Sequence, residues 1–250
     1  MTLHHSLRAA AGNVESGIVT SNLVLHLDAA DTNSYSGSGT TWADLSGNGN
    51  DFTLANANQF TTDTNGYKNM LTTAATIEYS GTGDVGTAAK TTAMVFTIPI
   101  SNNNWMALFK SVAGPAGGST STNGFYPVIS LDSFYNDYLG LYSFGTSGGL
   151  KQSTGEFSDP PNYSTKYNAF VFKFDSSTSP YWSFQYNDDT TVHTISLSNI
   201  AYSGGIRFIG NGSTGGLGWG RIAVVLFYTK HLTQAEIDQN YNFYKARFGI

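Results

Sequence analysis

The feature of this sequence that most constrains its fold is an alternation of side chains with a period of two residues. Phe170, Phe172 and Phe174 share one side of an extended segment, and residues 182–186 repeat the pattern. Positions i and i+2 lie on the same face of a strand but not of a helix. Similar segments, separated by turn-forming residues, recur at 93–100, 105–112, 126–131, 138–144 and 193–197. This pattern predicts a single all-β domain over residues 22–250, an antiparallel sandwich or jelly roll.

The composition excludes several classes of protein. Only 12% of the residues are charged and the formal net charge is −5, which argues against a nucleic-acid binder with a basic surface. No apolar run is long enough for a transmembrane helix, so we expect no membrane insertion. Cysteine is absent, which excludes disulfide bonds, thiolate zinc sites and a thiol nucleophile. The 28 glycines and 14% of aromatic residues are typical of a β-rich protein with many turns.

Residues 1–21 differ from the rest of the chain, and we expect them to form a short N-terminal arm. Helical spacing gives this arm an apolar stripe with a basic residue beside it, and these are the expected anchoring residues: Leu3, Leu7, Arg8 and Ala11. The alternative is a frayed terminus. A secretory signal is not expected, because Arg8 comes late and Glu15 and Gly17 interrupt the apolar stretch. The arm would attach the chain to a neighbouring protein.

The end of the sequence predicts a strand followed by a helix. Residues 222–228 are an apolar run of strand length. Thr233 and Glu236 have the spacing of a capping box, in which each side chain accepts from the backbone amide of the other residue. Gly249 ends the predicted helix, and apolar residues follow the cap at helical spacing: Ile237, Tyr241 and Tyr244.

Two parts of the sequence are specific enough to suggest a family. They are residues 23–31 continuing through 36–50, and residues 220–224 followed by 232–237 with Asn240 and Tyr241. They resemble the opening and closing signatures of concanavalin A-like, laminin-G-like jelly-roll domains. The most similar variant occurs in virion structural proteins of tailed bacteriophages, notably those of marine and cyanobacterial hosts. The resemblance implies that the first and last strands pair, and that the C-terminal helix closes one end of the sandwich.

The opening signature contains a candidate metal site. Side-chain oxygen atoms surround two glycines in a short loop, and Ca²⁺ takes six to eight such ligands. Some laminin-G-like domains hold calcium, so calcium is the candidate cofactor. The alternative is a tight turn in which Asp and Asn side chains bond the local backbone while Trp42 packs inward. The four residues concerned are Asp44, Asn48, Asn50 and Asp51.

The acidic residues do not have the spacing of a glycanase. Enzymes of the laminarinase type in this superfamily carry Glu-x-Asp-x-Glu on one strand, which brings two carboxyl groups close together. Of the four glutamates, Glu236 alone has an acid two or four residues later, and the capping box already explains it. No histidine spacing predicts a metal cluster. The sequence therefore predicts a protein without enzymatic activity.

A carbohydrate site is a further hypothesis. Lectin-like sandwiches bind sugars with aromatic rings flanked by amide and hydroxyl groups. The strand at 138–144 and the segment before residue 186 supply such groups. The alternative is that the aromatic side chains pack in the core or across strands. The candidate glycan-binding residues are Tyr138, Tyr142, Tyr181 and Gln185.

Together these observations predict a bacteriophage virion structural protein displayed on the capsid or tail, of the decoration, cement or fibre type. It would be made in the host cytoplasm, held on the particle by its N-terminal arm, and assembled as a homo-oligomer. Its expected partners are other virion proteins, with host surface glycans as the candidate ligand. The alternatives are a free or secreted carbohydrate-binding module and, third, a polysaccharide depolymerase.

Overall fold

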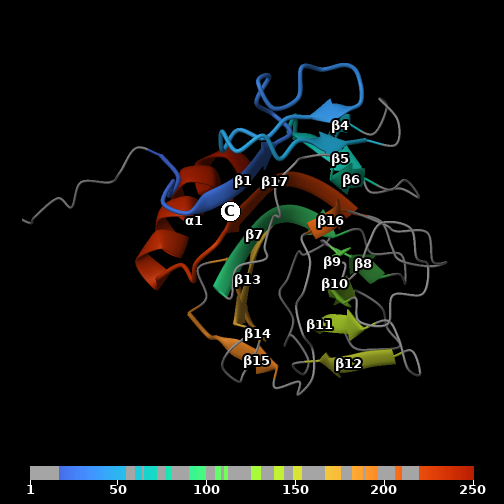
Figure 1. Ribbon diagram of the computed structural model, residues 1–250. Coiled ribbons are helices and arrows are strands. Elements are labelled where there is room, and N and C mark those ends of the chain that lie inside the picture. The colour runs from blue at the N-terminus through green and yellow to red at the C-terminus, as the bar shows by residue number, and fades with distance from the viewer. Residues whose placement is uncertain are drawn as a thin grey trace, which may run out of the picture.

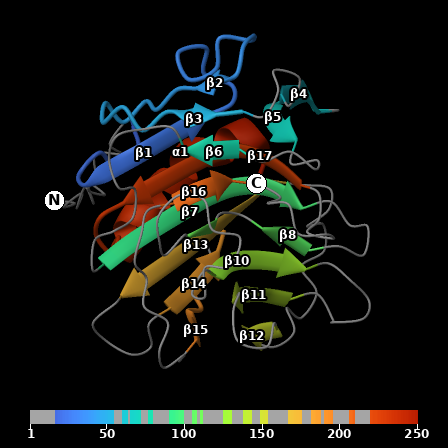
Figure 2. The ribbon, with the colours of Figure 1, turned by 45° about the vertical axis from the view of Figure 1, so that its right-hand side comes forward.

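The fold is mostly antiparallel β, with a helix at the C-terminus (Figures 1 and 2). In this computed structural model the described residues are 17–54, 60–63, 65–71, 77–79, 90–99, 105–107, 110–111, 125–130, 138–143, 149–153, 167–175, 182–187, 190–195, 206–209 and 220–250. Within these ranges, no helix has the length and apolar character needed to cross a membrane. The expected β class and the C-terminal helix are confirmed.

The largest sheet of the described residues is built around the last strand of the chain. Its order is β15 (His193–Ile195), β14 (Trp182–Tyr186), β13 (Asn168–Asp175), β7 (Lys90–Pro99), β17 (Gly220–Tyr228), β5 (Lys68–Leu71) and β4 (Phe60–Thr62). One edge of β17 pairs with β7. The other edge is shared by β5 and by β1 (Leu23–Asp28), so the expected pairing of the first and last strands is present.

Two smaller antiparallel sheets are also present in the described part of the chain. The first has the order β12 (Gly149–Ser153), β11 (Tyr138–Ser143), β10 (Phe125–Ser130) and β8 (Trp105–Ala107). The second has the order β2 (Thr41–Trp42), β3 (Phe52–Thr53), β6 (Ile77–Tyr79), β16 (Ile206–Ile209) and β9 (Lys110–Ser111). The strand expected at 105–112 is therefore divided into β8 and β9, which belong to different sheets.

The predicted alternation places the aromatic residues of β13 in one core. Phe172 lies opposite Ala93 of β7 on one side and Phe184 of β14 on the other. This core lies between the large sheet and the β2–β3 part of the second small sheet. Its residues include Leu25, Leu27, Trp42, Phe52, Val95, Phe170, Phe172, Phe174, Trp182, Phe184 and Phe227.

The opposite face of the large sheet forms a second core under the helix α1 (Gln234–Phe248). Figure 1 shows α1 lying along the outer side of this sheet, away from β8–β12. The helix was expected to close one end of the sandwich, and that expectation is wrong, because its apolar side chains pack on the sheet face. The contributing residues include Met94, Phe96, Val171, Val224, Leu226, Tyr228, Ile237, Tyr241, Tyr244 and Phe248.

Both predicted ends of α1 are present. The Thr233 hydroxyl accepts from the Glu236 amide at 3.3 Å, and the Glu236 carboxylate accepts from the Thr233 amide at 2.9 Å. Hydrogen bonds from Lys230 and from the Thr233 backbone lower the pKa of Glu236. Gly249 ends the helix with φ of +64°, a left-handed conformation that glycine adopts without steric cost.

Candidate functional site

The loop after β1 is organised by the side chain of Asp44. Its Oδ1 accepts from the backbone amides of His26 at 2.9 Å and Ser46 at 2.8 Å. Its Oδ2 accepts from the Ser46 hydroxyl at 2.7 Å and from the Asn50 amide at 3.0 Å. Both carboxylate oxygens therefore bind donors of the chain itself.

The other three predicted calcium ligands also form hydrogen bonds within the fold. Asp51 accepts from the backbone amide of Asp44 at 2.8 Å. The side-chain amides of Asn48 and Asn50 donate to backbone carbonyls of β1 at 3.0 and 2.6 Å. Gly47 has φ of +84°, as a tight turn requires here. These contacts are those of the tight turn that was the alternative interpretation. Among the described residues no group of three His, Cys, Asp or Glu side chains could hold a metal ion.

An ion pair and a hydrogen bond connect β1 to the last turn of α1. The guanidinium of Arg247 donates to both oxygens of Asp28, each at 2.8 Å, and the Asp28 side chain is only 4% exposed. Two residues earlier in β1, the His26 ring lies 2.8 Å from the Tyr244 hydroxyl. Burial lowers the pKa of His26, against the opposing effect of Asp28 and other nearby carboxylates. Burial also raises the pKa of Tyr244.

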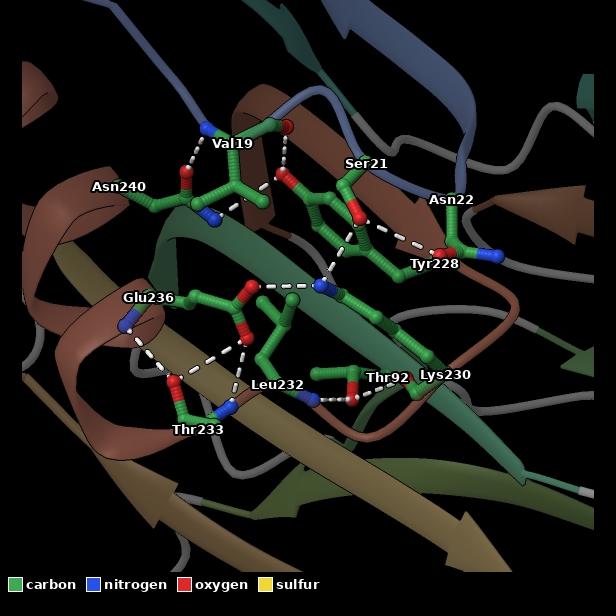
Figure 3. A network of polar contacts seen from close by, with 10 residues as sticks. All are labelled: Val19, Ser21, Asn22, Thr92, Tyr228, Lys230, Leu232, Thr233, Glu236 and Asn240. Atoms are coloured by element: carbon green, nitrogen blue, oxygen red, sulfur yellow. Dashed lines mark hydrogen bonds and ion pairs between the residues drawn. The ribbon is translucent and has the colours of Figure 1, made fainter. Parts of the chain in front are cut away.

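The described end of the predicted arm is bound to the chain's own helix (Figure 3). The backbone amide of Val19 donates to Asn240 Oδ1 at 2.8 Å, and the carbonyl of Val19 accepts from the Tyr228 hydroxyl at 3.0 Å. Asn240 Nδ2 donates to the same hydroxyl at 3.0 Å. Val19 is thus held through both its backbone amide and its backbone carbonyl.

Two further contacts extend this attachment. Gln239 Nε2 donates to the carbonyl of Gly17 at 2.9 Å. Lys230 Nζ donates to the Ser21 hydroxyl at 3.1 Å, as Figure 3 shows. Residues 17–21 therefore belong to the folded body, although they were assigned to the arm. The four predicted anchoring residues lie outside the described residues: Leu3, Leu7, Arg8 and Ala11.

The structure does not bring Gln185 to a glycan-binding surface. Its side chain is 2% exposed on the α1 side of β14, and its amide donates to Gln234 Oε1 at 3.0 Å. Tyr138 and Tyr142 belong to β11, but their side chains lie outside the described part of the chain. Tyr181, next to β14, also lies outside it.

A group of buried polar atoms was not predicted from the sequence. Six side chains of the described residues each have a buried oxygen or nitrogen atom without a hydrogen bond of normal geometry: Trp42, Asp63, Asn69, Tyr167, Trp182 and Arg221. They come from distant segments of the sequence. The only sequence signal is the Asp-x-Asn-Gly turn at residues 63–66, which predicts a hairpin and not a binding site.

The overall fold has relatives among solved structures, although no known family model and no curated protein matches the sequence. Trypanosoma rangeli sialidase in complex with sialic acid is similar over 90% of this chain and 33% of its own, with a TM-score of 0.55 and 14% identity. The binding domain of botulinum neurotoxin serotype D/C is similar over 89% of this chain and 51% of its own, with a TM-score of 0.58 and 12% identity. Another receptor binding domain gives a TM-score of 0.59 with 15% identity.

These similarities establish the kind of fold. This chain spans about a third of the sialidase and about half of the toxin domain. The aligned partners are β-sandwich, lectin-like domains, and at this level of identity the likeness concerns architecture alone.

Proposed function

We propose that this chain is a non-enzymatic, lectin-like jelly roll that recognises carbohydrate and is displayed on the capsid or tail of a bacteriophage. One observation supports the recognition role above all. About nine tenths of the chain aligns with sandwich domains of a sialidase solved with sialic acid and of a toxin binding domain. A glycan is therefore the ligand class we assign.

The virion role is supported by the two sequence signatures that resemble phage structural proteins. These segments lie about 170 residues apart, yet β1 pairs with β17, and the Asp28–Arg247 ion pair links β1 to α1. The family resemblance therefore concerns one contiguous unit of the fold. Residues 1–16 would anchor this unit to other virion proteins, and homo-oligomers would present several copies of the glycan surface.

The absence of enzymatic activity is proposed from the roles of the acidic side chains described. Asp28 binds Arg247, Asp44 organises a loop, and Asp175 pairs with Lys90 at 3.3 Å. Glu236 caps α1. Each of these carboxylates already has a structural role.

A glycan array probed with the full chain tests carbohydrate recognition. We expect Tyr142→Ala to lose the binding seen with the unmodified protein. Phe243→Ala, which removes a 45% exposed aromatic ring on α1, is the matched control and should bind normally. Circular dichroism must show that both variants are folded. If the unmodified chain binds no glycan, the recognition role is wrong.

The virion role requires its own test. Electron microscopy of purified particles, with a tag on this chain, should find copies on the capsid or tail. A variant lacking residues 1–16 should fold but be absent from the particles. Residues 17–21 are retained because they contact α1 and β17. Secretion of the free protein would support the carbohydrate-binding-module alternative, and release of reducing sugars from a polysaccharide would support the depolymerase.

A further inference from the structure

The outer strip of α1, the face of the helix that points away from the large sheet, carries no charged residue. Helical spacing places this strip opposite the buried residues Ile237, Tyr241 and Tyr244. Phe243 is 45% exposed there, and its ring meets Tyr244 edge-on with a centroid distance of 4.9 Å. The solvent face of a surface helix is ordinarily polar and charged, so this strip has the character of a contact surface. It consists of Ala235, Gln239, Asn242, Phe243 and Ala246.

The four charged residues of α1 lie outside the strip. Glu236 and Arg247 form ion pairs with residues of other elements. Asp238 accepts from Gln234 Nε2 at 2.8 Å, and Lys245 lies on the same flank of the helix as Asp238. The charges of the helix are therefore placed on its flanks, and the surface between them is left uncharged.

The N-terminal segment enters the described structure on this strip. The Val19 amide donates to Asn240 Oδ1 at 2.8 Å, on the buried side of α1 (Figure 3). Two residues earlier, the Gly17 carbonyl accepts from Nε2 of Gln239, which belongs to the outer strip, at 2.9 Å. Toward the N-terminus the chain thus moves from the buried side of the helix to the outer strip. Phe243 follows Gln239 by about one helical turn, so the chain before Gly17 continues from a point close to the exposed ring.

Residues 1–16 have the length and the sequence pattern needed to cover the strip. At about 1.5 Å per residue, the strip extends over about 17 Å from Ala235 to Ala246. Residues 12–16 can span at most about 17 Å, so the residues before them can reach either end of the strip. Those residues carry the apolar stripe expected from the sequence: Leu3, Leu7 and Ala11.

We propose that residues 3–11 pack on the outer strip of the α1 helix of their own chain. The apolar stripe covers Phe243, and removal of its ring and of the leucine side chains from water supplies the free energy of the contact. Gly12 and Asn13 follow the stripe directly. These turn-forming residues allow the chain to change direction between the packed segment and Gly17.

The attachment of Gly17 to Gln239 favours the chain's own helix over that of a second copy. A short flexible linker holds two linked groups at an effective concentration in the millimolar range. A weak contact is therefore occupied within one chain at protein concentrations that are too low to join two chains. The hydrogen bonds of Gly17 and Val19 already order the chain as far as the strip.

This inference goes beyond the proposed function, because it concerns the free chain. On a particle, another virion protein would replace α1 as the partner of residues 1–16. The packing is tested without particles, so its failure would leave the virion role open. Conversely, absence of the chain from particles would leave the packing unaffected.

The rate at which trypsin cleaves after Arg8 reports whether the segment is packed. Arg8 is the only Lys or Arg before Lys68, so the cleavage product is unambiguous. Phe243→Asp places a charge in the contact, and we expect it to accelerate this cleavage about tenfold. Ser38→Asp makes a negative charge in an exposed loop between β1 and β2 and should leave the rate unchanged. Circular dichroism must show that both variants are folded, and equal rates in all three chains would overturn the proposal.

Hydrogen exchange of the unmodified chain completes the test and does not depend on a variant that folds. The amides of Leu7 and Ala11 should exchange at least about tenfold more slowly than in an unstructured chain. Exchange at the unstructured rate overturns the proposal. Protection that persists in Phe243→Asp also overturns it, because the segment then packs elsewhere.

Dilution distinguishes the chain's own helix from that of a second copy. Packing within one chain predicts the same protection of Leu7 and Ala11 after dilution by about a hundredfold, with a monomer in light scattering. Protection that is lost on dilution, together with a dimer at the higher concentration, would assign the segment to a second copy and overturn the self-contact.

Discussion

Arg247, in the last turn of α1, donates to both carboxylate oxygens of Asp28, the last residue of β1, at 2.8 Å each. The contact joins positions 219 residues apart. The guanidinium also lies 5.0 Å from the centre of the Tyr244 ring. The Asp28–Arg247 contact is the only ion pair between β1 and α1 among the described residues. It connects the first sequence signature to the helix that contains part of the second.

We expect Arg247→Met to destabilise the fold by about 2 kcal/mol, because it leaves a buried carboxylate without its cation. The aliphatic part of the side chain is largely preserved. Lys245 lies in the same last turn of α1 but forms no ion pair with β1. Lys245→Met should therefore destabilise the fold by less than about 0.5 kcal/mol. Urea unfolding followed by tryptophan fluorescence measures both, and equal effects would contradict the assigned role of the ion pair.

Asn240→Leu tests the attachment of the N-terminal segment. The variant removes the acceptor of the Val19 amide and a donor to Tyr228, so we expect a loss of about 2 kcal/mol. Hydrogen exchange at Val19 should become faster, and proteases should cleave near residue 17 more readily. Asn242→Leu makes the same change at an exposed position of α1 and should leave Val19 protected.

Asp44→Ala tests the role of the loop after β1. Its four donors lose their acceptor, and we expect a destabilisation of about 3 kcal/mol. Asp31→Ala, which removes the acceptor of a more exposed turn, should cost less than about 1 kcal/mol. Calorimetry of the unmodified chain should give the same unfolding temperature with calcium and with EDTA. A rise with calcium would support the metal hypothesis.

The buried His26 predicts a pH dependence of stability. Its folded-state pKa lies below the ordinary value of 6.5, so the unfolded chain takes up the proton first as the pH falls. Stability is therefore complete above about pH 6.5 and falls as the pH decreases from there toward the folded-state pKa. His26→Gln preserves a partner for Tyr244 without titrating. The difference between the two unfolding curves should be flat above pH 7 and should change below it; a difference that is constant with pH would contradict the prediction.

Local patterns in the sequence predicted much of the fold. The alternation at Phe170, Phe172 and Phe174 identified β13 and its core face, and the capping box identified the start of α1. These signals depend on neighbouring residues, whose spacing alone determines which way they face. The Asp and Asn turn chemistry around residue 44 was recognised for the same reason.

The features that the sequence did not predict depend on contacts between elements that lie far apart in the sequence, such as a helix packed on the face of a strand. Gln185 was expected to face a ligand because it alternates with Trp182, but α1 covers that side as well and buries it. The group around Tyr167 unites separate segments of the chain through long-range packing. The spacing of neighbouring residues in the sequence does not predict that these segments pack together.

The position of β17 has a consequence for the synthesis of this protein. β17 pairs with β1, β5 and β7 and follows all three in the sequence, so these strands leave the ribosome long before their common partner. Until then each has an open edge that can pair with another chain. A nascent copy in which β17 has not yet been synthesised is therefore a substrate for chaperones or for aggregation, and the addition of β17 joins these strands into one sheet.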